Sequence, residues 1–155
     1  MRKSIIEICL EINLPLRTLP AGDAFIQEGV RQGNLYILNE GTVEISKGGV
    51  ELTDVSTQGA VFGEVSQLMN TAPMATVKTI KESSFFVAEN AGVLLERHPE
   101  IYYHIACLLA ARLTSVLSYL VDIKKQYGDE DSHLGMMDEV LESLLHLQTG
   151  QGSSR

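Results

Sequence analysis

The sequence predicts a mainly β domain with flanking helices, in which a β-roll or jelly-roll barrel (a double-stranded β-helix) precedes a long C-terminal helix. From Leu16 to Ala88, short β-prone runs alternate with glycines, a pattern typical of short antiparallel strands joined by tight corners. Residues 35–38 and 42–45 flank Asn39-Glu40-Gly41, which indicates a hairpin. After Ala88 the apolar residues recur at helical spacing instead.

The remaining elements follow from local signals along the chain. Ser4 to Ile12 predicts a short amphipathic helix, which Pro15 stops. A second turn, Lys47-Gly48-Gly49, closes the second arm of the predicted hairpin. Residues 90–96 predict a short helix capped by its asparagine, and Pro99 suits the first turn of the next helix.

That last helix carries a regular apolar seam with alternating spacings of three and four, as in a coiled coil. The seam consists of Ala106, Leu109, Leu113, Val116, Leu120, Ile123 and Tyr127. Leu108, Leu117 and Val121 lie off the seam and can pack on the barrel. The pattern favours a homodimer formed through residues 100–127, and the alternative is that the whole stripe is core in a monomer.

The sequence divides into a main domain over residues 1–128, which includes the long helix, and two shorter parts. Residues 129–148 predict an acidic helical extension after the break at Gly128 to Ser132. The glycine- and serine-rich residues 149–155 predict a disordered tail.

Composition excludes several classes of function. With 20 acidic and 12 basic residues among 155, and a net charge of −8, the chain is poorly suited to binding DNA or an anionic membrane. Residues 101–123 are long enough to cross a bilayer, but Arg112 near their centre argues against a span. Cys9 and Cys107 predict two reduced, buried thiols, and no signal peptide is evident, so we expect a cytoplasmic protein.

The chemistry concentrates in Val61 to Val65 and Ala72 to Val77. A glycine followed by an acid at the start of a short helix directs backbone N–H groups at an anion and leaves the Glu64 carboxylate to accept from a sugar hydroxyl. This arrangement suits a cyclic sugar phosphate. The alternative is that Glu64 is only a solvated turn residue.

Together with residues 19–23, 28–29 and 35–45, this segment resembles the cyclic-nucleotide-binding domain family over roughly residues 14–127. The family includes the bacterial catabolite activator protein and the regulatory subunits of cyclic-nucleotide-dependent kinases. The resemblance implies that Glu64 holds a ribose 2′-hydroxyl and that an arginine about ten residues later pairs with the cyclic phosphate. Here Pro73, by ungapped counting, or Met74, by matching the proline, takes the arginine's place.

The resemblance implies a ligand-binding set with cAMP or cGMP as the ligand. Its members are Phe62, Gly63, Glu64, Val65, Pro73, Met74, Ala75, Thr76 and Arg112. Arg112 is expected to pair with Glu64 or to supply the missing positive charge, the alternative being an exposed arginine with a snorkelling stem. Val116 and Leu117 stand where the family often places polar contacts to the base.

The sequence predicts neither an enzyme nor a metal site, because catalytic motifs are missing and the four histidines lack ligand spacing. The acidic segment after Tyr127 is too short for the DNA-binding domain of the family's activators. We therefore expect a stand-alone sensor or regulatory module with weakened or lost nucleotide affinity, which signals through an effector protein. The alternative is a degenerate domain that acts as a protein-interaction scaffold.

Overall fold

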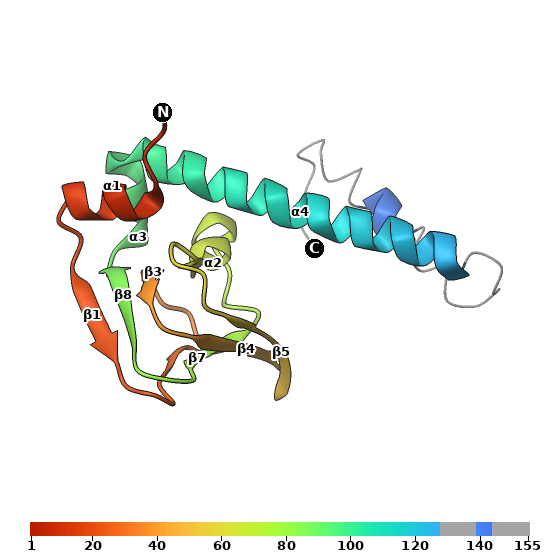
Figure 1. Cartoon of the computed structure of the whole chain (residues 1–155), viewed down its shortest axis with the longest axis horizontal. Coiled ribbons are helices and arrows are strands. Elements are labelled where there is room, and N and C mark those ends of the chain that lie inside the picture. Colours follow the sequence, from red (N-terminus) through yellow and green to blue (C-terminus); the bar gives the residue numbers. More distant parts are fainter. Residues whose placement is uncertain (128–138, 144–155) are drawn as a thin grey trace. The chain divides into compact units, whose positions relative to one another are not determined.

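The computed structural model describes residues 1–127 and 139–143 and divides the chain into two compact units, residues 1–105 and 106–155. The first unit contains two four-stranded antiparallel sheets and three short helices, and the chain continues into a 29-residue helix (Figure 1). The predicted jelly-roll architecture followed by a long C-terminal helix is confirmed.

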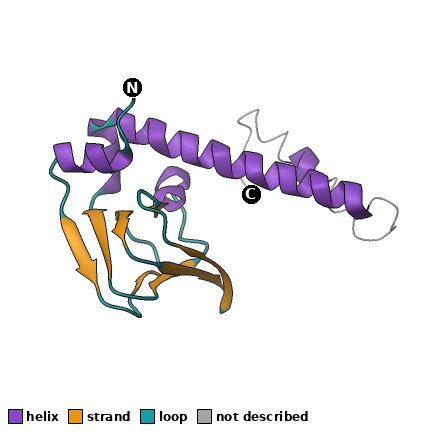
Figure 2. Cartoon of the chain, in the orientation of Figure 1, coloured by secondary structure: helices purple, strands orange, loops and turns teal. Residues whose placement is uncertain are grey.

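The elements of the first unit follow one another as mostly short strands (Figure 2). They are α1 (Ile5–Glu11), β1 (Leu16–Leu19), β2 (Ala24–Ile26), β3 (Leu35–Glu40), β4 (Val43–Lys47), β5 (Val50–Val55), β6 (Val61–Phe62), α2 (Glu64–Met69), β7 (Thr76–Thr79), β8 (Ser83–Ala88) and α3 (Ala91–Arg97), with α4 (Pro99–Tyr127) running on into the second unit. One sheet has the strand order β1-β8-β3-β6 and the other β2-β7-β4-β5.

The prediction of a hairpin around residues 39–41 is wrong. β3 pairs with β8 and β6, whereas β4 pairs with β5 and β7, so the turn carries the chain from one sheet to the other. A Cβ on Gly41 would lie 2.0 Å from the Ser83 Oγ, so only glycine lets the corner pass β8 this closely. The turn at residues 47–49 does form a hairpin, between β4 and β5.

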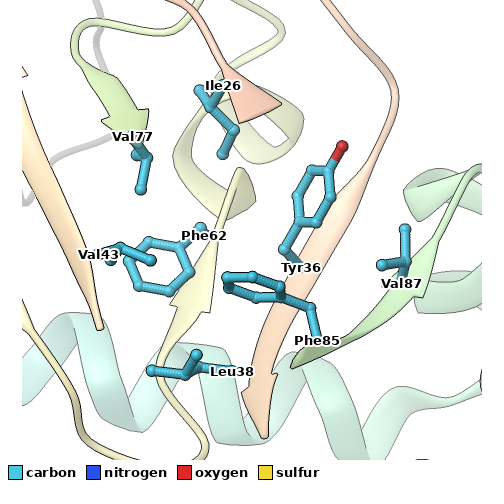
Figure 3. Packing of buried hydrophobic residues seen from close by; sticks show 8 residues of the cluster. All are labelled: Ile26, Tyr36, Leu38, Val43, Phe62, Val77, Phe85 and Val87. Carbon is cyan, nitrogen blue, oxygen red and sulfur yellow. The ribbon is translucent and has the colours of Figure 1, made fainter. Parts of the chain in front are cut away.

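The core lies between the sheets (Figure 3). Its buried members are Ile26, Tyr36, Leu38, Val43, Phe62, Val77, Phe85 and Val87. The Phe25 ring packs against Tyr36 and Phe85, with centroids 4.8 and 4.7 Å apart. In β3 and β8 the members are alternate residues, Tyr36 with Leu38 and Phe85 with Val87, because successive side chains point to opposite faces of a sheet.

Helix α1 begins with a capping box. The Glu7 N–H donates to the Ser4 Oγ at 3.2 Å, and the Ser4 N–H donates to the Glu7 Oε2 at 2.6 Å. The hydrogen bond from the Ser4 backbone lowers the pKa of the Glu7 carboxyl. Burial on the inner face of α1 raises the pKa of the Cys9 thiol to about 11.

The prediction of two buried thiols is correct for Cys9 and wrong for Cys107. In α4, Ile101 and Ile105 are one helical turn apart and are 0% and 1% exposed. Cys107 follows Ile105 by two residues, which places it about 200° around the helix, on the opposite side.

The second unit begins within α4, at Ala106. Several large apolar side chains of this part are exposed, among them Leu113, Val116 and Val121. By length and composition alone, the helix Pro99–Gln126 could also cross a membrane, since an 18-residue stretch within it has a mean hydropathy of 1.6. Residues 139–143 are helical and fall within the predicted extension, whereas the predicted break at 128–132 and tail at 149–155 lie outside the described residues.

Candidate functional site

The candidate site is a strand–helix–loop–strand segment that joins the two sheets. β6 pairs with β3, where Phe62 lies opposite Tyr36. The chain then passes through Gly63 and α2 and enters β7, which pairs with both β2 and β4. The segment that contains the predicted site residues 62–76 therefore begins in a strand of one sheet and ends in a strand of the other. Strand pairing fixes both of its ends to the barrel.

Gly63 caps α2 in a conformation that only glycine adopts easily. Its φ is 91° and ψ is −4°, in the left-handed region. A Cβ at this position would lie 2.6 Å from the Asn34 backbone oxygen. No side chain caps α2, so its first turn presents backbone N–H groups without competition from a cap. The glycine thus permits both the close packing on Asn34, which directly precedes β3, and the sharp entry into α2.

Glu64 is an acid at a buried position, with 5% of its surface exposed. Phe62 is buried beside it in the sequence, whereas Val65 is 41% exposed. In the described part of the chain, no buried side-chain nitrogen or oxygen lacks a hydrogen-bond partner. Because Glu64 is buried, it is not a solvated turn residue. Its hydrogen bonds are electrostatically stronger in the protein interior than they would be in water.

The loop that contains Pro73 and Met74 is tied to the connection between β2 and β3. Pro73 is buried, and its carbonyl accepts a hydrogen bond from the Gly29 N–H at 2.9 Å. The Glu28 N–H donates to the Thr76 Oγ1 at 3.0 Å. Met74, by contrast, is 65% exposed, so the two candidates for the arginine's place lie in different environments.

Sequence reasoning missed a cation beside the cassette. The Arg31 Nη2 donates to the Asn70 backbone oxygen at 2.7 Å and also to the Asn70 Oδ1, at the C-terminal end of α2. A polar pocket of about 370 Å³ lies here, lined by Arg31, Gln32, Gly33, Ser66, Gln67, Asn70 and Thr71. The only sequence signal was that Arg31 closely follows the Glu28-Gly29 pair of the resemblance.

Glu64 belongs to the first unit and Arg112 to the second, and their pairing stays a prediction. If the two side chains pair, the stability lost in Glu64→Gln should largely disappear in an Arg112→Met background, because a double-mutant cycle isolates the coupling between neighbours. Urea unfolding of the four proteins measures the effect. Losses that add within about 0.5 kcal/mol would show that the pair is absent.

Three carboxylates outside the predicted site come together on the β4–β5 hairpin. The ligand oxygens of Glu44, Glu51 and Asp54 lie within 4.8 Å of one another. The Lys78 Nζ is 3.4 Å from the Glu44 Oε1 and supplies a counter-charge. This group was not singled out from the sequence, since its members are spread over eleven residues.

Comparison with known proteins gives the same fold. The model of the "Cyclic nucleotide-binding domain" family matches residues 16–94. A cAMP-dependent protein kinase regulatory subunit from Mycosarcoma maydis is 33% identical over 110 residues, which covers 59% of this chain and 21% of that protein. This chain therefore spans about a fifth of the length of the kinase subunit.

Two solved structures share the architecture. The catabolite activator protein of Thermus thermophilus superposes with a TM-score of 0.62 at 23% identity, over 77% of this chain and 59% of that one. A cyclic nucleotide-binding domain from Methylobacillus flagellatus superposes with a TM-score of 0.63 at 19% identity, over 79% and 75% of the two chains. Both similarities concern the fold alone.

Proposed function

Because this chain belongs to the cyclic nucleotide-binding domain family, a family of usually non-catalytic regulatory modules, we propose that it is a non-enzymatic sensor with weakened or lost affinity for cAMP or cGMP. In this proposal the module acts in the cytoplasm and signals through an effector protein. The observation that carries the proposal is that both candidate places for the phosphate-binding arginine hold neutral residues, the buried Pro73 and the exposed Met74, whereas Gly63 and Glu64 are present.

The retained features support a residual nucleotide site. Gly63 keeps the close approach to β3 and the uncapped start of α2, and Glu64 keeps a buried carboxylate. The missing arginine determines how weakly the site binds a cyclic phosphate. A guanidinium binds a phosphate through two charge-assisted hydrogen bonds, and removing one partner of a desolvated pair costs about 3–5 kcal/mol. A dissociation constant of about 1 μM would thereby rise to roughly 0.1–4 mM.

Calorimetric titration of the whole chain with cAMP and with cGMP tests this proposal. We expect a dissociation constant near the millimolar range, weakened further in Glu64→Gln because the ribose hydroxyl would donate to a neutral amide oxygen instead of a charged carboxylate. Submicromolar binding by the wild-type chain would contradict the proposed loss of affinity.

The alternative function is a protein-interaction scaffold that binds no nucleotide. It is favoured by the neutral residues at both candidate arginine positions. In that case neither nucleotide would produce heat or shift the melting temperature at millimolar concentration, and Glu64→Gln would alter stability alone.

We further propose that the chain forms a homodimer through residues 100–127. The exposed apolar side chains Leu113 and Val116 belong to the seam and support this. Replacing Leu113 and Leu120 with glutamate should give monomers, because each change places an unpaired charge in the interface. Ser115→Glu with Ser118→Glu is the matched control at exposed positions off the seam. Sedimentation of wild-type chain as a monomer at micromolar concentration would refute the dimer.

A further inference from the structure

β5 is an edge strand that is exposed along almost its whole length. Among the described residues, the strands at the edges of the two sheets are β1, β6, β2 and β5, and β5 with six residues is the longest. Every residue from Val50 to Asp54 is exposed, including 63% of Val50 and 58% of Leu52. β4 covers one side of β5 (Figure 1). An edge strand of this kind leaves a row of backbone N–H and C=O groups for another strand.

A β-bulge in β5 brings acidic side chains together on one face of this edge. Thr53 lies opposite Ile45 and Glu51 lies opposite Ser46, so Leu52 has no opposite residue in β4. The extra residue reverses the alternation of side chains along the strand. Glu51 and Asp54, which a regular strand would point to opposite faces, therefore join Glu44 on one face, with their ligand oxygens within 4.8 Å of one another.

The resulting surface is negative. The three carboxylates lie close together, and among the described residues the Lys78 Nζ forms an ion pair with the Glu44 Oε1, at 3.4 Å. Glu51 and Asp54 are exposed, so their carboxylates face solvent at the edge of the sheet. The edge thus combines an unpaired strand, two exposed apolar side chains and an excess of negative charge.

We propose that β5 accepts an extended basic segment of a partner protein as an added strand. Backbone hydrogen bonds along the edge bind the segment regardless of its sequence, and alternate side chains provide selectivity. Lysine or arginine side chains of the segment lie against Glu51 and Asp54, and its apolar side chains lie against Val50 and Leu52. This inference goes beyond the proposed nucleotide response and does not depend on it.

The same charges select against a second copy of this chain. Two β5 strands side by side would bring acidic groups of both copies together, and like charges on neighbouring strands destabilise a pairing. Acidic residues and bulges at sheet edges are known devices against self-association. The edge is therefore closed to another copy but remains open to a basic strand.

A defined peptide tests the proposal. The probe is a fluorescently labelled nine-residue peptide that alternates lysine with valine and threonine, and its counterpart carries glutamate in place of lysine. Titration of the whole chain by fluorescence anisotropy should show binding of the basic peptide and none of the acidic one. Hydrogen exchange should show increased protection of backbone amides within residues 50–55. Binding should weaken as salt rises, because the charges are exposed.

Matched variants separate this site from a general charge effect. Glu51→Lys with Asp54→Lys should weaken binding about tenfold or more, because two attractive pairs become repulsive. Glu82→Lys with Glu96→Lys changes the net charge equally at exposed positions elsewhere and should leave binding unchanged. Glu51→Gln with Asp54→Asn preserves side-chain shape and should weaken peptide binding partially. This variant replaces the lysine variant in the test if the latter fails to fold.

Three results of these experiments would overturn the proposal, and a fourth comes from cross-linking. They are absence of binding by the wild-type chain, equal losses in the two lysine variants, and protection confined to residues outside 50–55. Cross-linking of β5 to β5 between two copies would also contradict it.

Discussion

Replacing Gly63 with alanine is expected to lower the free energy of unfolding by about 3–4 kcal/mol. Two costs add. An alanine at a φ of 91° occupies the left-handed region, which costs roughly 1–2 kcal/mol. Its Cβ would also lie 2.6 Å from the Asn34 backbone oxygen, so either α2 or β3 must shift. Urea unfolding measures the loss.

Gly22→Ala is the matched control for this change. Gly22 also has a positive φ, of 84°, but an added Cβ would meet nothing within 4 Å. Its loss should therefore stay at about 1–2 kcal/mol, the cost of the backbone conformation alone. Equal losses in the two variants would show that the close approach between the cassette and β3 contributes nothing to stability.

The second large effect is expected from restoring the arginine. If the cassette is otherwise intact, Pro73→Arg or Met74→Arg should strengthen cyclic-nucleotide binding by about 3 kcal/mol, or about 100-fold. The new guanidinium would bind the cyclic phosphate through paired, charge-assisted hydrogen bonds. Calorimetric titration with cAMP and cGMP measures the gain, and a higher melting temperature with nucleotide provides an independent readout.

The two positions for the new arginine differ in burial. Pro73 is buried in the loop that joins α2 to β7, whereas Met74 is 65% exposed. Met74→Arg should therefore cost little stability, and Pro73→Arg more, because its long side chain must leave a buried position. Pro73→Gln and Met74→Gln are the matched neutral controls. If neither arginine variant binds better than its glutamine control, the pocket has been lost for reasons other than the missing charge.

Much of the candidate site could be read from the order of the residues. Gly63 followed by Glu64 predicted the entry into a short helix, and the structure places that entry between β6 and α2. Burial was not predictable, because Glu64, Pro73 and Met74 differ in exposure through contacts with the rest of the barrel. Arg31 reaches the end of α2 from 39 residues away in the sequence, and no local pattern marks that contact.

What the sequence by itself determined were the features that depend on a few consecutive residues. Glycine spacing indicated the short strands, Asn90 indicated the start of α3, and apolar periodicity indicated α4. These signals act over one helical turn or one tight corner, where backbone sterics and local hydrogen bonds decide the conformation.

Only the tertiary structure decided which strands are partners and which side chains meet. β3 and β4 are neighbours in the sequence but lie in different sheets, because β3 pairs with β8 instead, where Leu38 lies opposite Phe85. The bulge at Leu52 likewise brings together acids that strict alternation would have separated. Strand partners are chosen by burying apolar faces contributed by distant parts of the chain, so no window of neighbouring residues contains the information.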